Sequence, residues 1–237
     1  MKKRRKVFFI LILPLIAIAT YFVLVKSELT KLQEIIIQGA SPTTEDRIRN
    51  KIQILIGNSI WHLDLDVTAH LIETDPWIKT VDLRRQLPKT LTISVVERRP
   101  VAVLGNGLGQ FKYVDEYSFI IDKANSQEIG EYPVLMGKEF FDKKDLRAKA
   151  LELIADLPQE GLVSKADLGD LRYSSEHGFQ MTLSKTGILI DLGKENIPLH
   201  IDRVRRVVQY LDQHQVNAMH IDSDYQKKVL VKVRKGR

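Results

Sequence analysis

The residues that could carry out chemistry are scattered along the chain and do not have the spacings that catalysis or metal binding requires. None of the six histidines lies three or four residues from another, and none belongs to an HExxH arrangement. The chain has no cysteine, which excludes disulfides, thiolate-bound zinc and thiol catalysis. It has neither a GxSxG nucleophile elbow nor a GxxxxGK[ST] phosphate-binding loop. We therefore expect no catalytic residue, no metal, no cofactor and no enzymatic activity.

Other conspicuous residues have structural explanations. The glycine-rich segment Gly105–Gly109 lacks the GxGxxG spacing and lies between two predicted strands, which favours a turn over a phosphate cradle. The acid pairs Asp64/Asp66 and Asp222/Asp224 lie at a predicted helix start and near a turn, where helix capping and solvation explain them. The two tryptophans are interpreted as core or domain-edge residues: Trp61 and Trp77.

The net charge of +6 is concentrated at the N-terminus. Residues 2–6 contribute five of these charges and leave +1 for the rest of the chain. A nucleic-acid-binding domain is expected to spread positive charge over one face, so this distribution predicts no nucleic-acid partner.

An apolar run from residue 7 to residue 25 follows the basic tail, residues 1–6. As a helix it would span roughly 28 Å, about the thickness of a hydrocarbon core. The basic tail should stay in the cytoplasm, which predicts a single-pass type II protein of the cytoplasmic (inner) membrane with its C-terminal domains outside the cytoplasm. A cleaved signal peptide is the alternative, because Ala17–Ala19 resembles a cleavage site. The apolar run continues past that site, which favours a retained transmembrane helix.

After a polar joint at residues 26–31, residues 32–98 show the order β-α-α-β-β. A strand at Leu32–Gln38 precedes one helix starting at Ser41–Asp46 and a second capped by Asp64 or Asp66. Two alternating runs around Gln86–Lys89 then predict a hairpin. Each helix has one apolar stripe and each strand one apolar face, so we expect two helices packed on one side of a three-stranded sheet.

Residues 99–234 predict a second domain of α+β class with an antiparallel sheet. Two helical stripes interrupt several short alternating strands. The predicted strands are Val101–Leu104, Gln110–Val114, Ser118–Ile121, Leu168–Tyr173, Gly178–Leu183, Ile188–Leu192 and Val229–Arg234, and the predicted helices are Lys143–Leu157 and Leu199–His214.

The final strand, Val229–Arg234, is a candidate for a sheet edge with unpaired main-chain groups. Lysines on such a strand guard against indiscriminate pairing, so one reading is an edge without a partner. The other is a selective partner that adds a strand by main-chain hydrogen bonds. The residues alone leave both readings open.

Residues 76–102 resemble the signature of the FtsQ/DivIB family of bacterial cell-division proteins. The resemblance rests on Pro76–Ile78, Leu87–Pro88, Glu97–Arg98 and Pro100–Ala102. Weaker similarity lies in Tyr113–Asp115, Pro133–Gly137, Thr182–Gly193 and Ile221–Tyr225. It implies a small POTRA domain at residues 32–98, followed by an FtsQ-type β domain at residues 99–234.

The resemblance also implies a function. Members are non-enzymatic proteins of the division septum that bind FtsB/DivIC-type and FtsL-type bitopic proteins and help control the FtsW/FtsI septal peptidoglycan synthase. Asp224 stands where the family commonly has arginine, so the charged contacts should differ. The implied partner-binding residues are Tyr225, Gln226, Lys227, Lys228, Val229, Leu230 and Val231.

Two other classes of function remain as alternatives. One is a membrane-anchored POTRA chaperone or assembly protein of the cell envelope, which would need a barrel or a dedicated cargo. The other is an anchored envelope hydrolase or peptidoglycan-binding enzyme, which would need a cleft lined by paired acids.

Overall fold

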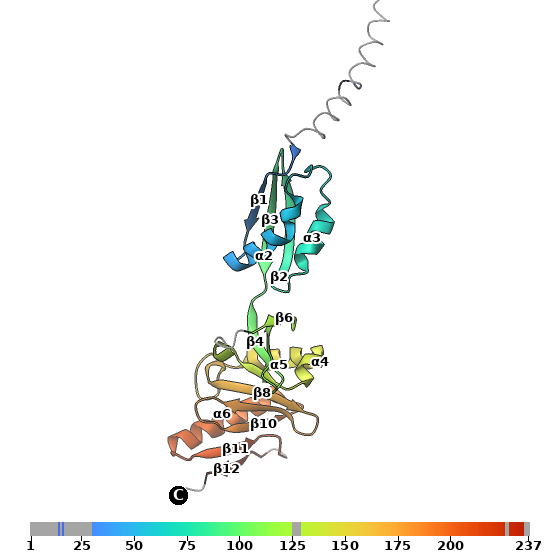
Figure 1. Ribbon diagram of the computed structural model, residues 1–237. Helices are drawn as coiled ribbons and strands as arrows, with labels where there is room; N and C mark the ends of the chain where they lie inside the picture. Colours follow the sequence, from blue (N-terminus) through green and yellow to red (C-terminus); the bar gives the residue numbers. More distant parts are fainter. Residues whose placement is uncertain (1–13, 15, 17–29, 125–128, 226–227, 235–237) are drawn as a thin grey trace, which may run out of the picture. The chain divides into compact units, whose positions relative to one another are not determined.

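The computed structural model describes residues 14, 16, 30–124, 129–225 and 228–234 (Figure 1). Its contacts divide the chain into two units, Met1–Arg98 and Arg99–Arg237. The predicted basic tail lies outside the described residues, as does the predicted span at residues 7–25 apart from Pro14 and Ile16. Within the described ranges, no helix has the length and apolar character needed to cross a membrane.

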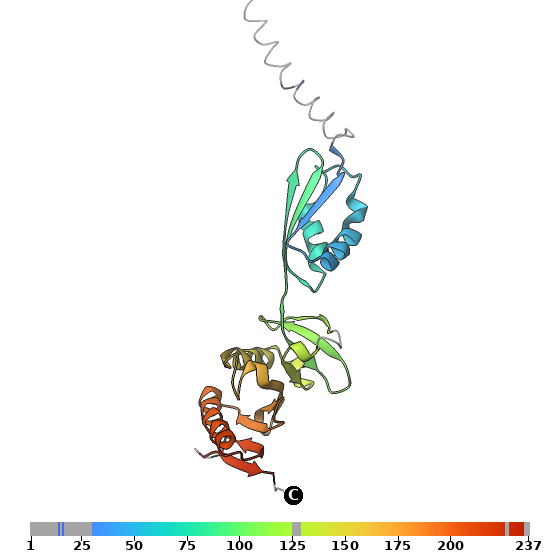
Figure 2. The ribbon, with the colours of Figure 1, turned by 90° about the vertical axis from the view of Figure 1, so that its left-hand side faces the viewer.

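Unit 1 has the predicted order β-α-α-β-β. Its three-stranded sheet has the order β1-β3-β2, with β1 parallel and β2 antiparallel to β3. Both α-helices cover the same face of this sheet (Figure 2). The elements are β1 (Glu34–Gln38), α2 (Pro42–Ile52), the 3-10 turn η2 (Gln53–Leu55), α3 (Leu65–Glu73), β2 (Ile78–Gln86) and β3 (Thr90–Glu97).

The core of unit 1 joins the apolar stripes of the helices to the buried face of the sheet. Ile48, Ile52 and Ile72 of the helices are fully buried, as are Leu91 and Ile93 of β3. These are the periodic positions of the sequence, which explains why local patterning predicts the unit well.

Polar contacts lie at the N-terminal ends of both helices. The Asp64 side chain accepts hydrogen bonds from the backbone N–H groups of Asp66 and Val67, so Asp64 and not Asp66 caps α3. The Glu97 carboxylate accepts bonds from the backbone N and the hydroxyl of Ser41, at 2.9 and 2.8 Å, just before α2. Burial raises the pKa of Glu97, but hydrogen bonds from Thr44 and Ser41 and the charge of Arg47 outweigh it, so the pKa lies below its ordinary value of 4.5.

Unit 2 is built on a nine-stranded sheet with the order β12-β11-β10-β9-β8-β7-β4-β5-β6. Helices α5 and α6 contribute to one apolar core with the sheet. The strands are β4 (Pro100–Gly105), β5 (Phe111–Asp115), β6 (Ile120–Lys123), β7 (Val134–Met136), β8 (Leu168–Ser174), β9 (Gly178–Leu183), β10 (Leu189–Gly193), β11 (Ala218–Asp222) and β12 (Leu230–Val233). The helices are α4 (Glu139–Asp142), α5 (Lys144–Asp156) and α6 (Ile197–Gln213), with 3-10 turns η3 (Ile129–Glu131) and η4 (Lys165–Asp167).

The prediction of an antiparallel sheet in unit 2 is wrong, because the sheet is mixed. The pairs β4/β7, β7/β8 and β10/β11 are parallel. Parallel neighbours need a crossover connection, and α5 and α6 lie in the β7–β8 and β10–β11 connections. The sequence pattern indicates both helices but misses the short strands β7 and β11, so it misses the parallel pairs.

Arg147 is a buried cation in unit 2 that bonds to backbone carbonyls. Its side chain donates to the Ser118 carbonyl at 3.0 and 2.8 Å and to the carbonyls of Phe140 and Phe141 at 2.7 and 3.2 Å. Burial lowers the pKa of Arg147 below its ordinary value. The side chain therefore ties α5 to α4 and to the turn before β6.

Candidate partner-binding edge

Strand β12 forms one end of the nine-stranded sheet, as predicted for the last strand of the chain. It pairs with β11 in antiparallel register, with Val231 opposite Ile221 and Lys232 opposite His220. A register shift between Ala218 and His220 bends the pair locally. The described strand starts at Leu230, one residue later than predicted.

The direction of the main-chain groups along β12 follows from one hydrogen bond. The N–H of Arg234 donates to the Asn217 carbonyl at 2.8 Å, toward β11. In an antiparallel ladder, residues alternate between facing and not facing their neighbour, so Lys232 and Leu230 also face β11. The N–H and C=O groups of Val231 therefore point away from the sheet, where an added strand would bind.

Five of the seven predicted site residues belong to the described chain: Tyr225, Lys228 and Val229 precede β12, and Leu230 and Val231 begin it. Tyr225 is half exposed, and its carbonyl accepts a 2.7 Å bond from the N–H of Lys228. Lys228 and Leu230 are exposed, whereas Val229 and Val231 pack partly against the core. Two of the predicted residues lie outside the described ones: Gln226 and Lys227.

Buried contacts hold the turn that leads from β11 to Tyr225. Ser223 is fully buried, and its hydroxyl donates to the Asp191 carbonyl at 2.6 Å. Gly193 has a φ of +76°, and a Cβ there would lie 2.5 Å from the Asp224 carboxyl carbon. Asp224 thus lies against the backbone of β10, in a space that only glycine leaves open.

A polar row crosses the sheet beside this edge. Gln180 donates to the Asp191 carboxylate at 2.6 Å, and His220 Nε2 lies 2.7 Å from the other oxygen of that carboxylate. His220 in turn is paired with Lys232 of β12. The sequence gives no signal for this row, because its members come from four strands and meet only through the sheet register.

One serine lies near a histidine beside this edge, and their surroundings differ from those of a catalytic pair. Ser223 Oγ lies 3.4 Å from His200 Nδ1, but both side chains are buried and the serine hydroxyl is bonded to a carbonyl. Among the described residues, no group of three or more His, Cys, Asp or Glu side chains could hold a metal ion. The described residues of the edge present main-chain hydrogen-bonding groups together with exposed lysine and apolar side chains.

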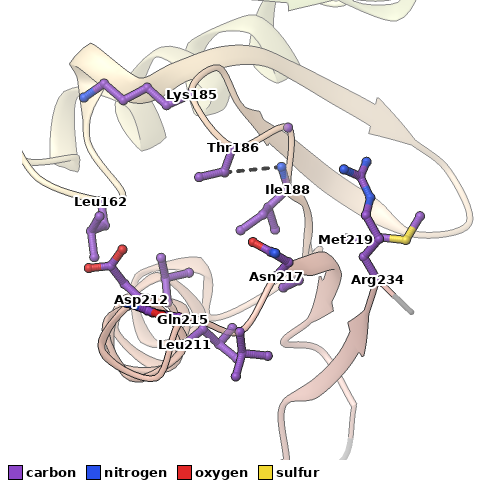
Figure 3. A pocket seen from close by; sticks show the side chains of 14 residues that line it. Leu162, Lys185, Thr186, Ile188, Leu211, Asp212, Gln215, Asn217, Met219 and Arg234 are labelled. Atoms are coloured by element: carbon purple, nitrogen blue, oxygen red, sulfur yellow. Dashed lines mark hydrogen bonds between the residues drawn. The ribbon is translucent and has the colours of Figure 1, made fainter. Parts of the chain in front are cut away.

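A cavity of about 750 Å³ adjoins the end of β12 (Figure 3). Its walls come from the β9–β10 turn at Lys185–Ile188, the C-terminal end of α6, the start of β11 and Arg234. Leu162, Leu211 and Met219 give it an apolar part, while Lys185 and Arg234 supply cations at its wall. The cavity therefore lies at the end of the sheet that carries β11 and the end of β12.

Comparison with known proteins covers both units. Residues 30–98 match the family described as "POTRA domain, FtsQ-type", and residues 102–225 match "Cell division protein FtsQ/DivIB, C-terminal". The chain is 27% identical over 220 residues to "Cell division protein FtsQ" of Geotalea daltonii, covering 90% of this chain and 79% of the relative. It is 26% identical over 223 residues to the protein of that name from Geobacter sp. strain M21, with the same coverage of 90% and 79%. A third relative of that name, from Anaeromyxobacter sp. strain K, is 26% identical over 84% of this chain and 69% of its own length.

Proposed function

The chain belongs to the FtsQ/DivIB family of bacterial cell-division proteins, and we propose that it is a non-enzymatic scaffold whose β12 edge binds an FtsB/DivIC-type partner. The observation that carries this proposal is the position of β12. It is a terminal strand of the sheet, and Val231 directs its main-chain groups outward. A partner strand can add to such an edge by main-chain bonds, while side chains on the two strands provide selectivity.

The side chains around the edge fit a mixed polar and apolar partner. The side chains of Tyr225, which precedes β12, and of Leu230, its first residue, are exposed, and Lys228 and Lys232 add positive charge. A partner strand with an apolar anchor and flanking acids would complement this pattern. Asp224, which lies against Gly193, requires a different charged contact from the arginine that is common in the family.

The remaining parts of the proposal follow the family. Residues 1–6 form a cytoplasmic tail, residues 7–25 a transmembrane helix of type II orientation and residues 26–31 a joint. Residues 32–98 are the POTRA domain and residues 99–234 the FtsQ-type β domain. The protein is placed at the division septum, where with FtsB-type and FtsL-type proteins it helps control the FtsW/FtsI synthase.

Substituting Tyr225 tests the proposed binding surface. Tyr225→Ala removes an exposed side chain, so the fold should persist while the dissociation constant for the FtsB-type partner rises. An interface hot spot of about 2 kcal/mol corresponds to roughly 30-fold in affinity. Lys228→Glu should also weaken binding. The measurement is biolayer interferometry on the full chain in lipid nanodiscs.

The opposite edge of the same sheet offers a matched control. Tyr117 is exposed in the turn before β6, the strand that ends the sheet on the other side. Tyr117→Ala removes a comparable exposed ring and should leave partner binding unchanged. Full-strength binding by a folded variant that lacks Lys228–Arg237 would refute the proposed edge.

A functional fluorescent fusion at the N-terminus should gather at midcell during constriction, and an even envelope distribution would contradict the proposed role in division.

A further inference from the structure

We infer that one pole of unit 1 docks on the bilayer surface and inserts apolar side chains into the interface, an inference that rests on the proposed transmembrane helix at residues 7–25. Three backbone hydrogen bonds define this pole around the start of the described chain. The N–H of Ile60 donates to the Thr30 carbonyl, that of Gly57 to the Leu32 carbonyl and that of Gln33 to the Lys89 carbonyl, each at 2.9 Å. Figures 1 and 2 show the start of β1 and the β2–β3 turn at the same end of the unit. We call this end the anchor-proximal pole.

Four large apolar side chains are exposed at the anchor-proximal pole. Ile54 is 80% exposed, Ile56 51%, Trp61 45% and Leu87 51%. Ile54 and Ile56 flank Leu55 at the end of the 3-10 turn. The Asn58 side chain donates to the Ile54 carbonyl, and the Asn58 carbonyl accepts a bond from the N–H of Leu32, just before β1. Single exposed apolar residues are ordinary, but several at one pole indicate a surface that contacts something apolar.

The charges at the pole fit a membrane surface with anionic lipid. Lys31 and Lys89 lie within the hydrogen-bonded segments that define it. Arg85 adds a third cation, which donates to the Ile60 and Leu63 carbonyls. Of the nearby acids, Asp64 caps α3, the Glu34 carboxylate accepts a bond from the Thr90 hydroxyl at 3.2 Å, and Asp66 is exposed in the first turn of α3. Tryptophan and lysine are both favoured at the membrane–water interface, where a ring meets the headgroups and a cation meets phosphate.

The length of the connecting chain identifies the bilayer as the occupant of this surface. The apolar run ends at Val25 and the described chain resumes at Thr30, so four residues lie between them. Fully extended, the five steps from Val25 to Thr30 reach at most about 18 Å. The headgroup layer of one leaflet accounts for about 5–7 Å of that distance. The pole is therefore held next to the lipid surface, where its exposed apolar groups can insert.

The two tryptophans of the chain provide the test and its internal control. Trp61 lies at the pole, whereas Trp77 lies just before β2, whose nine residues run toward the pole. That strand separates the two by about 27 Å along its axis. In full-chain protein reconstituted into phosphatidylethanolamine/phosphatidylglycerol vesicles, Trp77→Phe leaves Trp61 as the single fluorophore, and Trp61→Phe leaves Trp77. We expect brominated acyl chains to quench most of the Trp61 emission and to leave the Trp77 emission unchanged.

A second set of variants separates insertion from folding. Ile54→Ser and Ile56→Ser together, in the Trp77→Phe chain, remove exposed apolar groups and should abolish most of the Trp61 quenching. Leu108→Ser, at an exposed loop position of unit 2, should leave the quenching unchanged. Circular dichroism checks that each variant is folded.

The outcomes distinguish this inference from the proposed function. Protein that floats with the vesicles and resists carbonate extraction, yet shows unquenched Trp61, would overturn the docking of the pole and leave the transmembrane helix intact. Protein that does not float would overturn both. Equal quenching of Trp61 and Trp77 would also overturn docking by this pole, because it would bring the far end of unit 1 equally close to the lipid.

Discussion

Replacing Val231 with proline tests whether β12 binds its partner through the main chain. The N–H of Val231 points away from β11, so proline removes an outward donor and leaves the β11 ladder in place. The partner carbonyl opposite that N–H would then be buried without a donor, at a cost of about 1–3 kcal/mol. This corresponds to roughly 5- to 150-fold weaker binding of the FtsB-type partner.

Two further substitutions make this prediction specific. Val231→Ala also loses packing against the core but keeps the N–H, so it measures the side-chain contribution alone. Lys232→Pro removes an N–H that faces β11, so it should lower the free energy of unfolding of unit 2. The dissociation constants are measured by biolayer interferometry on full chains in nanodiscs, with thermal unfolding alongside. If Val231→Pro and Val231→Ala are both folded and bind equally well, main-chain docking at this position is refuted.

Three other predictions concern the contacts that support the two units. The pKa of Glu97 is lowered in the folded state, so its contribution to stability is present above the unfolded value of 4.5 and is lost as pH falls through the folded value. Urea unfolding should therefore show Glu97→Gln less stable than the unmodified chain at pH 7, with a difference that shrinks toward pH 3; a constant difference would contradict the assignment. Arg147→Met should destabilise unit 2 by about 3 kcal/mol, because the carbonyls it bonds lose their donor; urea unfolding with little change would show that water replaces the guanidinium. Gly193→Ala should lower the melting temperature and weaken partner binding through displacement of Asp224, and adding Asp224→Ala should restore part of both.

The element order of unit 1 could be predicted because each element carries its own local signals. The helices have apolar stripes of helical period, and the hairpin strands alternate on both sides of Gln86–Lys89. The buried core residues of unit 1 are therefore the apolar residues at the periodic positions of the sequence. The choice between Asp64 and Asp66 as the cap needed the structure, because both have suitable side chains and only the backbone geometry decides which carboxylate reaches the free N–H groups.

Unit 2 was harder to predict because two of its strands are short and depend on their neighbours. β7 has three residues, too few for alternation to separate it from a loop. β11 has five, but its apolar residues Ala218, Met219 and Ile221 do not alternate strictly with polar ones. Both lie beside strands already formed, and their parallel pairing depends on the crossovers through α5 and α6. Long-range pairing of this kind leaves little trace in a local sequence pattern.

The sequence by itself determined the class of elements, the absence of the tested catalytic motifs and cysteine, the predicted basic tail and apolar run, and the residues that carry the family resemblance. These properties depend on composition and on spacings of a few residues. Only the tertiary structure decided that β12 ends the sheet, that Val231 turns its main-chain groups outward, and that Asp224 lies against Gly193. It also decided that Ile54, Trp61 and Leu87 share one exposed pole. Each of these features depends on contacts between segments that are far apart in the chain. The strand register and the loop conformations determine those contacts.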